Sequence, residues 1–243
     1  MARFFLDPDA WNAAPELTGE EAVHCVRVLR AKVGDRIHVF DGRGRSAPAE
    51  IVALSKQAVR LKLGEVAIEP EAAISLTLAQ AVIKGKGMEW LIQKAVELGV
   101  DQIQPLATRH AVVKPGDDKP EKWRRIALEA CKQCGRSRLP VIHDTVRFSE
   151  WVSMDGGDLR CVAALFGEPR PFHSVLEQAG AIRSATFLVG PEGDFSADEM
   201  DDAMRSGWVP VTLGATVLRS ETAALYGASV FRYFSQSINY KSD

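Results

Sequence analysis

The chain has 243 residues, 26% of them charged and 46% hydrophobic, and its formal net charge of −2 at pH 7 argues against a uniformly basic nucleic-acid binder. The composition is that of an ordinary soluble globular protein, long enough to bury a sizeable core and to form two domains. The first residues lack the apolar segment of a signal peptide and no apolar run has the length of a membrane span, so we expect a cytoplasmic protein without membrane contact.

The first part of the chain, residues 1 to about 70, is predicted to form a small, mostly β domain. Thr18 and Glu21 have the spacing of a capping box, which predicts a short helix through Leu29. Short strands separated by tight turns indicate a compact barrel. The predicted strands are 36–40, 49–54 and 58–63, and the hinge to the next domain is expected at 69–71.

From Ile74 onward, strands alternate with helices, which is typical of a parallel sheet in an α/β domain. Residues 74–83 are almost all apolar, as expected of a strand that is buried on both faces. The elements predicted next are a helix closed by Gly99, a strand over 100–106, a helix from Pro120 to Gly135, a strand over 160–166 and a helix through Gln178.

Two short apolar runs, 187–189 and 209–213, each end in a glycine-containing loop before a helix begins. Ligands of open α/β sheets bind beyond the carboxyl ends of such strands, and glycines let the backbone approach a ligand closely. Either loop alone could be an ordinary strand-to-helix turn. Both loops together, on strands that we take to be neighbours, predict a ligand site.

The helices that follow these loops have recognisable start signals. Ser196 with Glu199 forms a capping box and predicts a helix from Ala197 to about Gly207. Ser220 is predicted to cap a last helix that runs towards Ser235. This last helix is apolar enough to serve either a dimer interface or the core, through Leu225, Tyr226, Val230, Phe231 and Phe234.

Basic residues are unevenly distributed along the chain. Residues 109–138 contain nine Lys or Arg against four Asp or Glu, and residues 27–45 contain six against two. Such stripes can neutralise the phosphates of a nucleic acid, but they are equally typical of a solvated helix face. The charge pattern leaves both interpretations open.

Several kinds of chemistry are absent from the sequence. Cys131-x-x-Cys134 lies late in a helical pattern without a matching second pair, which favours buried small side chains over a metal or redox site. The five histidines are isolated, so no metal site is expected, and there is neither a Walker A loop nor a G-x-S-x-G elbow. Gly85-x-Gly87 matches a dinucleotide fingerprint only weakly, because Trp90 occupies the third glycine position.

The segments GPEG at 190–193 and LGATVLRSETAAL at 213–225 resemble the RsmE family of SPOUT methyltransferases. VLRAKVGDRIHVFDG, MEWLIQKAVELGV and EACKQCGRSRLP agree with it in order, so the resemblance spans almost the whole chain. It implies an α/β fold, with an N-terminal PUA-like RNA-binding barrel over 1–70 and, over 71–243, a SPOUT-type parallel sheet with a C-terminal trefoil knot. It also implies a homodimer that uses S-adenosylmethionine to methylate N3 of a specific uridine in 16S ribosomal RNA of the small ribosomal subunit.

By this resemblance, backbone groups of three loops hold the cofactor. The implied cofactor-binding residues are Leu165, Phe166, Gly167, Leu188, Val189, Gly190, Pro191, Glu192, Gly193, Leu213, Gly214, Val217 and Leu218. Arg219 would hold a phosphate or stabilise the deprotonated imide, and Glu221 is either a base or a carboxylate favoured by the helix dipole. The residues expected to contact the RNA backbone are Arg27, Arg30, Arg36, Lys122, Arg125, Arg136 and Arg138.

Three positions depart from the usual pattern of the family. Asp194 stands where glycine is common, Thr216 where arginine is frequent, and Gly87 where a basic residue usually precedes the Met-Glu pair. Two alternatives to this function are a SPOUT enzyme that methylates a ribose 2′-hydroxyl and a non-catalytic RNA-binding protein of the same fold. The first would carry Asn-x-Gly-x-x-Arg and Ser-Leu-Asn motifs where this chain has ELGV and RSETA, and the intact glycine loops count against the second.

Overall fold

The computed structural model describes residues 1–243 except 12–13, 56, 112–119, 155, 166 and 240–243, and it omits the side chains of 237–239. The chain divides into two compact units. The first consists of Met1–Glu71 with Leu128–Leu139, and the second of Ala72–Ala127 with Pro140–Asp243. No helix in the described part of the chain is long and apolar enough to cross a membrane.

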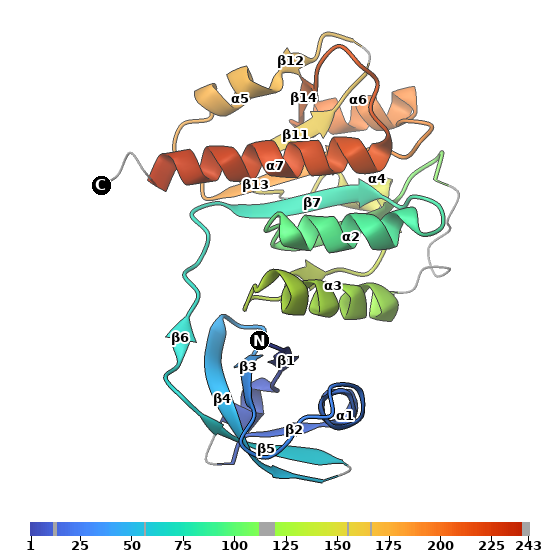
Figure 1. The fold of residues 1–243 in the computed structure, drawn as a ribbon. Helices are drawn as coiled ribbons and strands as arrows, with labels where there is room; N and C mark the ends of the chain where they lie inside the picture. The colour runs from blue at the N-terminus through green and yellow to red at the C-terminus, as the bar shows by residue number, and fades with distance from the viewer. Residues whose placement is uncertain (12–13, 56, 112–119, 155, 166, 240–243) are drawn as a thin grey trace. The chain divides into compact units, whose positions relative to one another are not determined.

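The first unit is built on a six-stranded sheet in the order β1-β3-β4-β5-β2, with β6 paired to β4 (Figure 1). Its strands are β1 (Arg3–Phe5), β2 (Glu16–Thr18), β3 (Arg36–Phe40), β4 (Arg45–Leu54), β5 (Ala58–Leu63) and β6 (Ala67–Ile68). A 3₁₀ turn (Pro8–Trp11), α1 (Gly19–Val23) and a π-helical turn (His24–Val28) complete it. The predicted strands are therefore confirmed, β3 and β5 at their predicted bounds, while β4 begins four residues earlier than predicted.

Alternating side chains of these strands make the core of the first unit. Along β4, buried and exposed residues alternate, as they do where one face of a sheet is covered. Ile51 of β4 packs with Phe4, Leu17, Val39 and other apolar residues of the same sheet. The alternation explains why the strands of this unit could be read from the sequence.

The predicted capping box at Thr18 is wrong. The Thr18 side chain caps nothing, and the helix that it starts is α1, which continues directly as the π-helical turn. The Glu21 carboxylate instead accepts a hydrogen bond from the backbone N–H of Phe5 at 3.1 Å and pairs with Lys132. Partners from distant parts of the chain have replaced the local interaction, because Lys132 is itself nearly buried and needs a counter-charge.

The segment 128–139 is bound to the turn between β3 and β4 by main-chain hydrogen bonds. Leu139 donates to the Gly42 carbonyl at 2.9 Å, and Gly44 donates to the Ser137 carbonyl at 3.0 Å. The guanidinium of Arg138 donates to the Glu69 carbonyl at 3.1 Å. The sequence QCGRSRL is thus an integral part of the first unit, although it lies about sixty residues beyond Glu71.

The second unit contains an eight-stranded sheet in which every pairing is parallel. The strand order is β10-β8-β7-β13-β11-β14-β12, with β9 paired to β8. The strands are β7 (Ser75–Ala81), β8 (Gln102–Ala107), β9 (Val141–Ile142), β10 (Val146–Arg147), β11 (Leu159–Ala163), β12 (Arg170–Pro171), β13 (Ser184–Val189) and β14 (Val209–Thr212). The predicted parallel α/β sheet is confirmed.

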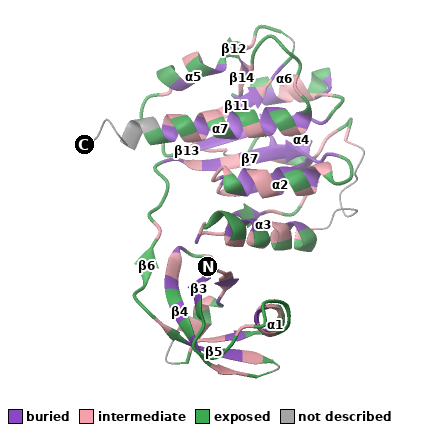
Figure 2. Ribbon diagram, viewed as in Figure 1, coloured by how far each residue is buried: buried purple, intermediate pink, exposed green. Residues whose placement is uncertain are grey.

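Helices cover both faces of this sheet, and its central strands are buried (Figures 1 and 2). The helices of the chain after residue 86 are α2 (Gly87–Glu97), α3 (Pro120–Cys134), α4 (Phe148–Trp151), α5 (Phe172–Gln178), α6 (Ala197–Arg205) and α7 (Ser220–Asn239). The predicted capping box of α6 is confirmed, with both of its reciprocal hydrogen bonds between Ser196 and Glu199 present.

The expectation that the two glycine-containing loops leave neighbouring strands is wrong. β11 lies between β13 and β14 and pairs with both, Cys161 being opposite Phe187 on one side and Val209 on the other. The order of strands in the sheet is thus not their order in the sequence. As a consequence, the carboxyl end of β11 adds a third chain segment between the two loops.

Candidate functional site

A cavity of about 610 Å³ lies at the carboxyl ends of β11, β13 and β14. Its lining residues come from these three strand ends and from the start of α7, and they are 163–165, 189–192, Asp194, 212–221 and Ala223. The volume is within the range of sites that hold a small molecule or cofactor. The structure therefore places a ligand-sized cavity where the glycine-containing loops predicted one.

Most of the residues expected to bind the cofactor line this cavity. They are Leu165, Val189, Gly190, Pro191, Glu192, Leu213, Gly214, Val217 and Leu218. Gly167 and Gly193 are not among the lining residues, Leu188 is buried in the core below it, and Phe166 lies outside the described residues. Ala163 and Ala164 were not expected at the site, and Ser220 was expected there only as the cap of the last helix. Ala215 and Ala223 belong to the motif at 213–225 but were not expected to bind the cofactor, because small apolar side chains carry no signal of their own.

The loop after β13 has a compact backbone that needs glycine at its first position. A Cβ added to Gly190 would lie 3.0 Å from the Asp194 carboxylate and 3.2 Å from the Phe195 ring. Asp194 has a φ of 58°, in the left-handed region, and its carboxylate accepts from the backbone N–H of Phe195. Aspartate tolerates this conformation through such local hydrogen bonds, so the position can be Asp where glycine is common in the family it resembles.

His110, which follows β8, contacts the loop after β13 through its imidazole ring. Its Nδ1 lies 3.1 Å from the Gly193 carbonyl oxygen and 3.0 Å from that of Asp194. A carbonyl oxygen only accepts hydrogen bonds, so Nδ1 carries the proton and Nε2 keeps the lone pair when the ring is neutral. No role was expected for His110 from the sequence, because the residues that it contacts are more than eighty positions away.

Apolar side chains are exposed at this cavity. Leu165 and Val217 both line it, and their side chains remain 49% and 77% exposed. Exposed aliphatic groups beside backbone polar groups suit a ligand with a flat apolar face and a hydrogen-bonding edge. The charged side chains that line the cavity, Glu192, Asp194, Arg219 and Glu221, come from the loop after β13 and from the beginning of α7.

Two charged side chains do line the cavity at the start of α7. Arg219 is exposed, and no carboxylate in the described part of the chain pairs with its guanidinium. Glu221, two residues later, is half-buried. The sequence expected both residues beside the cofactor site, and the structure places both at the cavity.

The prediction that Ser220 caps α7 is wrong. Ser220 is the first residue of α7, and the carbonyl of Arg219 accepts the hydrogen bond of Ala223 at the helix start. The buried Ser220 hydroxyl instead donates to the Gly190 carbonyl at 2.5 Å and accepts from Nε2 of Gln80 at 2.8 Å. Two tertiary partners, brought by β7 and by the loop after β13, have taken the place of the local cap.

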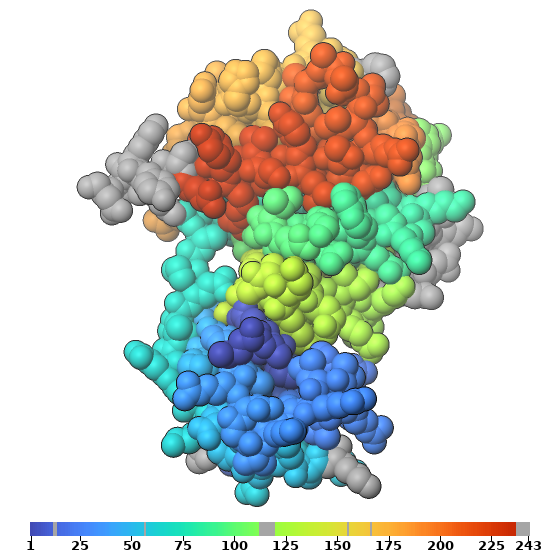
Figure 3. All heavy atoms as spheres, in the orientation of Figure 1, coloured from blue at the N-terminus to red at the C-terminus, as the bar shows by residue number. Residues whose placement is uncertain are grey.

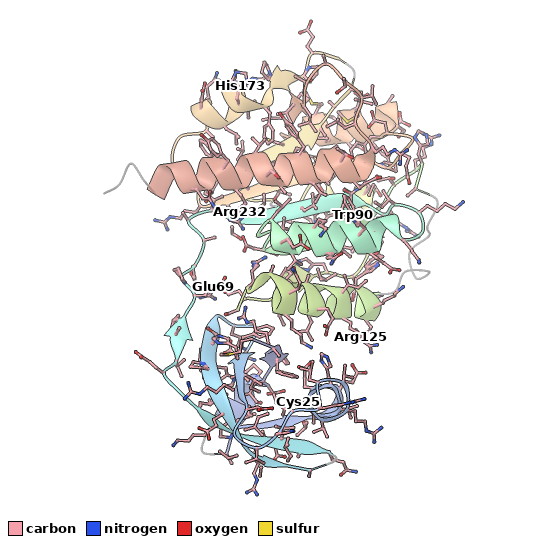
Figure 4. All side chains as sticks on the ribbon, in the orientation of Figure 1. Cys25, Glu69, Trp90, Arg125, His173 and Arg232 are labelled. Carbon is pink, nitrogen blue, oxygen red and sulfur yellow. The ribbon has the colours of Figure 1, made fainter. Side chains whose placement is uncertain are left out.

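The residues expected to contact RNA differ in their exposure and in the interactions that they make. Arg27, Arg30 and Arg36 are exposed in the first unit, and Arg125 is exposed on α3 (Figure 4). Lys122 pairs with Glu89, and Arg138 donates to the Glu69 carbonyl. Arg136 is half-buried. Part of the basic stripe on α3 is thus already engaged by protein acceptors.

The two thiols of Cys131-x-x-Cys134 differ in their surroundings. In the described part of the chain, no group of three or more His, Cys, Asp or Glu side chains could hold an ion. Burial raises the pKa of Cys131 to about 12, so this thiol stays protonated and packs as a small apolar group. Cys134 is exposed at the end of α3, so the expectation that both thiols are buried is wrong for this residue.

Comparison with protein families finds two matches. Residues 70–232 match a family model described as an RNA methyltransferase domain, and residues 17–64 match an RNA methyltransferase PUA domain. The chain is 32% identical to ribosomal RNA small subunit methyltransferase E of Bacillus subtilis. The alignment runs over 247 residues and covers 96% of this chain and 96% of the relative. It is 34% identical to the protein of that name from Synechocystis, covering 87% of this chain and 70% of the relative.

Solved structures agree with these matches. The chain is similar to a ribosomal RNA small subunit methyltransferase E from Neisseria gonorrhoeae bound to S-adenosyl methionine, with 27% identity, coverage of 96% and 97%, and a TM-score of 0.85. It is also similar to a putative methyltransferase from Legionella pneumophila in complex with SAM, with 30% identity, the same coverage, and a TM-score of 0.87. The predicted combination of an N-terminal PUA-like domain with a SPOUT-type sheet is confirmed.

Proposed function

The chain belongs to the family of ribosomal RNA small subunit methyltransferase E, and we propose that it transfers a methyl group from S-adenosylmethionine to N3 of a specific uridine in 16S ribosomal RNA. The observation that carries the proposal is the cavity of about 610 Å³, in which main-chain groups of three loops lie beside the exposed side chain of Arg219. Such a cavity suits a cofactor recognised through backbone atoms.

The residues at the cavity fit S-adenosylmethionine in size and in chemistry. Backbone N–H and C=O groups of 163–165, 189–192 and 212–218 would hold its adenine and ribose, with Leu165 and Val217 against the flat faces. When bound, this cofactor supplies a methyl group that its sulfonium has already activated. The protein therefore has to position the base in line with that methyl group and to help N3 lose its proton.

Arg219 and Glu221 are the side chains that can assist at N3. The Arg219 cation would stabilise the deprotonated imide of the uracil or hold an adjacent phosphate, because a nearby positive charge favours the anionic form. Glu221 would accept the N3 proton or orient the base. Its alternative role is that of a carboxylate in the first turn of α7, which the helix dipole favours.

The RNA and the assembly are part of the same proposal. Residues 1–70 would form an RNA-binding barrel, and residues 71–243 a methyltransferase domain whose cofactor site includes a trefoil knot. The phosphates of 16S ribosomal RNA would be bound by Arg27, Arg30, Arg36, Lys122, Arg125, Arg136 and Arg138. We infer that the enzyme works as a homodimer in the cytoplasm, where its ribosomal substrate is assembled.

Replacing Arg219 tests the mechanism. Arg219→Ala should lower methyl transfer to small ribosomal subunits by about 100-fold or more, because it removes the charge that stabilises the anionic base. Its affinity for S-adenosylmethionine should stay within a few-fold, since backbone groups dominate that site. Radiolabel incorporation and calorimetric titration measure the two quantities, and turnover close to that of the wild type would remove Arg219 from the mechanism.

The matched variant Glu221→Gln separates the two roles of the carboxylate. It keeps the size of the side chain but cannot accept a proton. Loss of turnover would show that Glu221 acts as the base, and retained turnover would show that it only interacts with the helix dipole.

Mass spectrometry of the product nucleosides decides between the candidate functions. 3-Methyluridine supports the proposal, and a 2′-O-methylnucleoside supports the ribose methyltransferase. A protein that neither binds the cofactor nor forms a product is an RNA-binding adaptor.

A further inference from the structure

A buried polar side chain lies directly beneath the cofactor cavity. Gln80, near the carboxyl end of β7, is fully buried, and its Nε2 donates to the Ala81 carbonyl and to the Ser220 hydroxyl, each at 2.8 Å. Ser220 in turn donates to the Gly190 carbonyl at 2.5 Å. A continuous chain of hydrogen bonds therefore runs from β7 through the start of α7 to the loop after β13.

The three partners of this chain are far apart in the sequence, and two of them line the cavity. Gly190 and Ser220 are lining residues, whereas Gln80 is not. Gly190 begins the loop that bends back at Asp194, and Ser220 follows the loop that contains Gly214. The hydrogen bonds thus join the two glycine-containing loops to each other and to a strand of the sheet.

Burial makes these hydrogen bonds costly to break. Gln80 has no exposed surface and Ser220 is 6% exposed, so a donor or acceptor that loses its partner cannot turn to water instead. Gln80 is also a poor choice for mere packing, because its Oε1 is buried without a hydrogen-bond partner among the described residues. The buried Oε1 of Gln80 lowers stability, so the Gln80 amide is better explained by the groups that its Nε2 holds in place.

We propose that Gln80 and Ser220 are positioning residues, which hold the 190–193 loop and the start of α7 at the spacing that binds the methyl donor. The inference rests on the proposed function, because it assigns the cofactor to this cavity. Without the hydrogen bonds, the Gly190 carbonyl and the first turn of α7 lose their common anchor, and the loops sample wider spacings. Affinity then falls, because the backbone groups that recognise the cofactor must be ordered again on binding.

Ser220→Ala tests this proposal, with Thr186→Val as its matched control. Thr186 lies on β13, the strand that leads to Gly190, and is 3% exposed, and its hydroxyl also donates to a backbone carbonyl, that of Gly156. It does not line the cofactor cavity. Both variants should lower the thermal midpoint, and Ser220→Ala should lower it more, because it loses two buried hydrogen bonds of the hydroxyl whereas Thr186→Val loses one.

Only Ser220→Ala should also weaken binding of S-adenosylmethionine, by about tenfold in calorimetric titration, because only this variant separates the Gly190 carbonyl from the start of α7. Ser220→Thr keeps the hydroxyl and should restore the affinity to within about threefold of the wild type. In the protein without cofactor, hydrogen exchange of amides 190–195 should be faster in Ser220→Ala than in Thr186→Val.

A second variant keeps the test independent of the alanine substitution. Gln80→Met has nearly the same volume without the amide, and it should weaken cofactor binding as Ser220→Ala does. The double variant should be no weaker than either single one, since both act through one chain of hydrogen bonds. Additive losses, or Ser220→Ala with wild-type affinity, would overturn the positioning role alone, whereas a wild-type protein that does not bind the cofactor would overturn the proposed function.

Discussion

At the scale of single residues, the carboxylate of Asp158 holds the start of strand β13 in place. Its Oδ2 accepts hydrogen bonds from the backbone N–H groups of Arg183, at 2.7 Å, and Ser184, at 3.0 Å. These bonds, that of Arg183 first, lower the pKa of Asp158 below its ordinary value of 3.8, because they favour the ionised carboxylate. Asp158 lies just before β11 and thereby aligns the start of β13 beside it.

The lowered pKa of Asp158 predicts a pH-dependent contribution to stability. Because the folded pKa lies below the unfolded one, the stabilisation is present above pH 3.8 and is lost as the pH falls through the folded pKa. The free energy of unfolding of wild type and Asp158→Asn, measured in urea, should therefore differ at pH 7 and converge in strong acid. Asp201→Asn, an exposed position, controls for the change in net charge; a difference that does not vary with pH would contradict the assignment.

At the scale of elements, α7 packs unusually closely on the sheet. A Cβ at Gly227 would lie 2.0 Å from the Phe187 ring of β13, and that ring already contacts Phe172 and Phe231. Further along the helix, Arg232 donates to the Ile74 carbonyl at 2.9 Å and pairs with Asp101 at 2.5 Å (Figure 4). Close packing at one point and hydrogen bonds at another fix the axis of the helix whose first turn lines the cavity.

Gly227→Ala should destabilise the protein, although alanine is the better helix former. The helix-propensity gain of about 1 kcal/mol is smaller than the strain of forcing a methyl group into the Phe187 ring, for which overpacking costs of about 1–3 kcal/mol are typical. Thermal unfolding should show a lower midpoint for Gly227→Ala. Ser229→Ala, on the exposed side of the same helix, should leave it nearly unchanged. Equal midpoints for all three proteins would show that the sheet yields to the added methyl group.

At the scale of the whole molecule, the face formed by α2 and α7 is the candidate interface for a second copy of the chain. The two helices pack side by side in the second unit, and their surfaces are continuous in Figure 3. Trp90 of α2 and Tyr226 and Tyr233 of α7 are 47%, 46% and 77% exposed. Phe231 was predicted to serve either this interface or the core. It is buried in the core against Phe172 and Phe187.

Association through this face can be measured directly. Tyr233→Asp with Tyr226→Asp should shift the protein from dimer to monomer in sedimentation velocity, because it places two charges in an apolar contact. Met204→Asp, at an exposed apolar position of α6, should leave the assembly unchanged. A wild-type protein that sediments as a monomer at all concentrations would reject the homodimer.

The sequence by itself determined the features that depend on neighbours along the chain. Residues a few positions apart predict the capping box of Ser196 and Glu199 and the bounds of β3 and β5. They also predict the two glycine-containing loops. The motif at 213–225 identified the family because it includes residues of the cavity itself. These features could be predicted because the residues that make them are only a few positions apart.

Only the tertiary structure decided the features that depend on residues far apart in the chain. β11 lies between β13 and β14, the hydroxyl of Ser220 binds Gly190 and Gln80 instead of capping its helix, and Glu21 pairs with Lys132. Segment 128–139 likewise belongs with the first unit. Ser220 and Glu21 each had a plausible local partner, but burial among distant segments supplied another one. Strand order and the place of segment 128–139 depend on contacts between distant residues, which no pattern of neighbouring residues records.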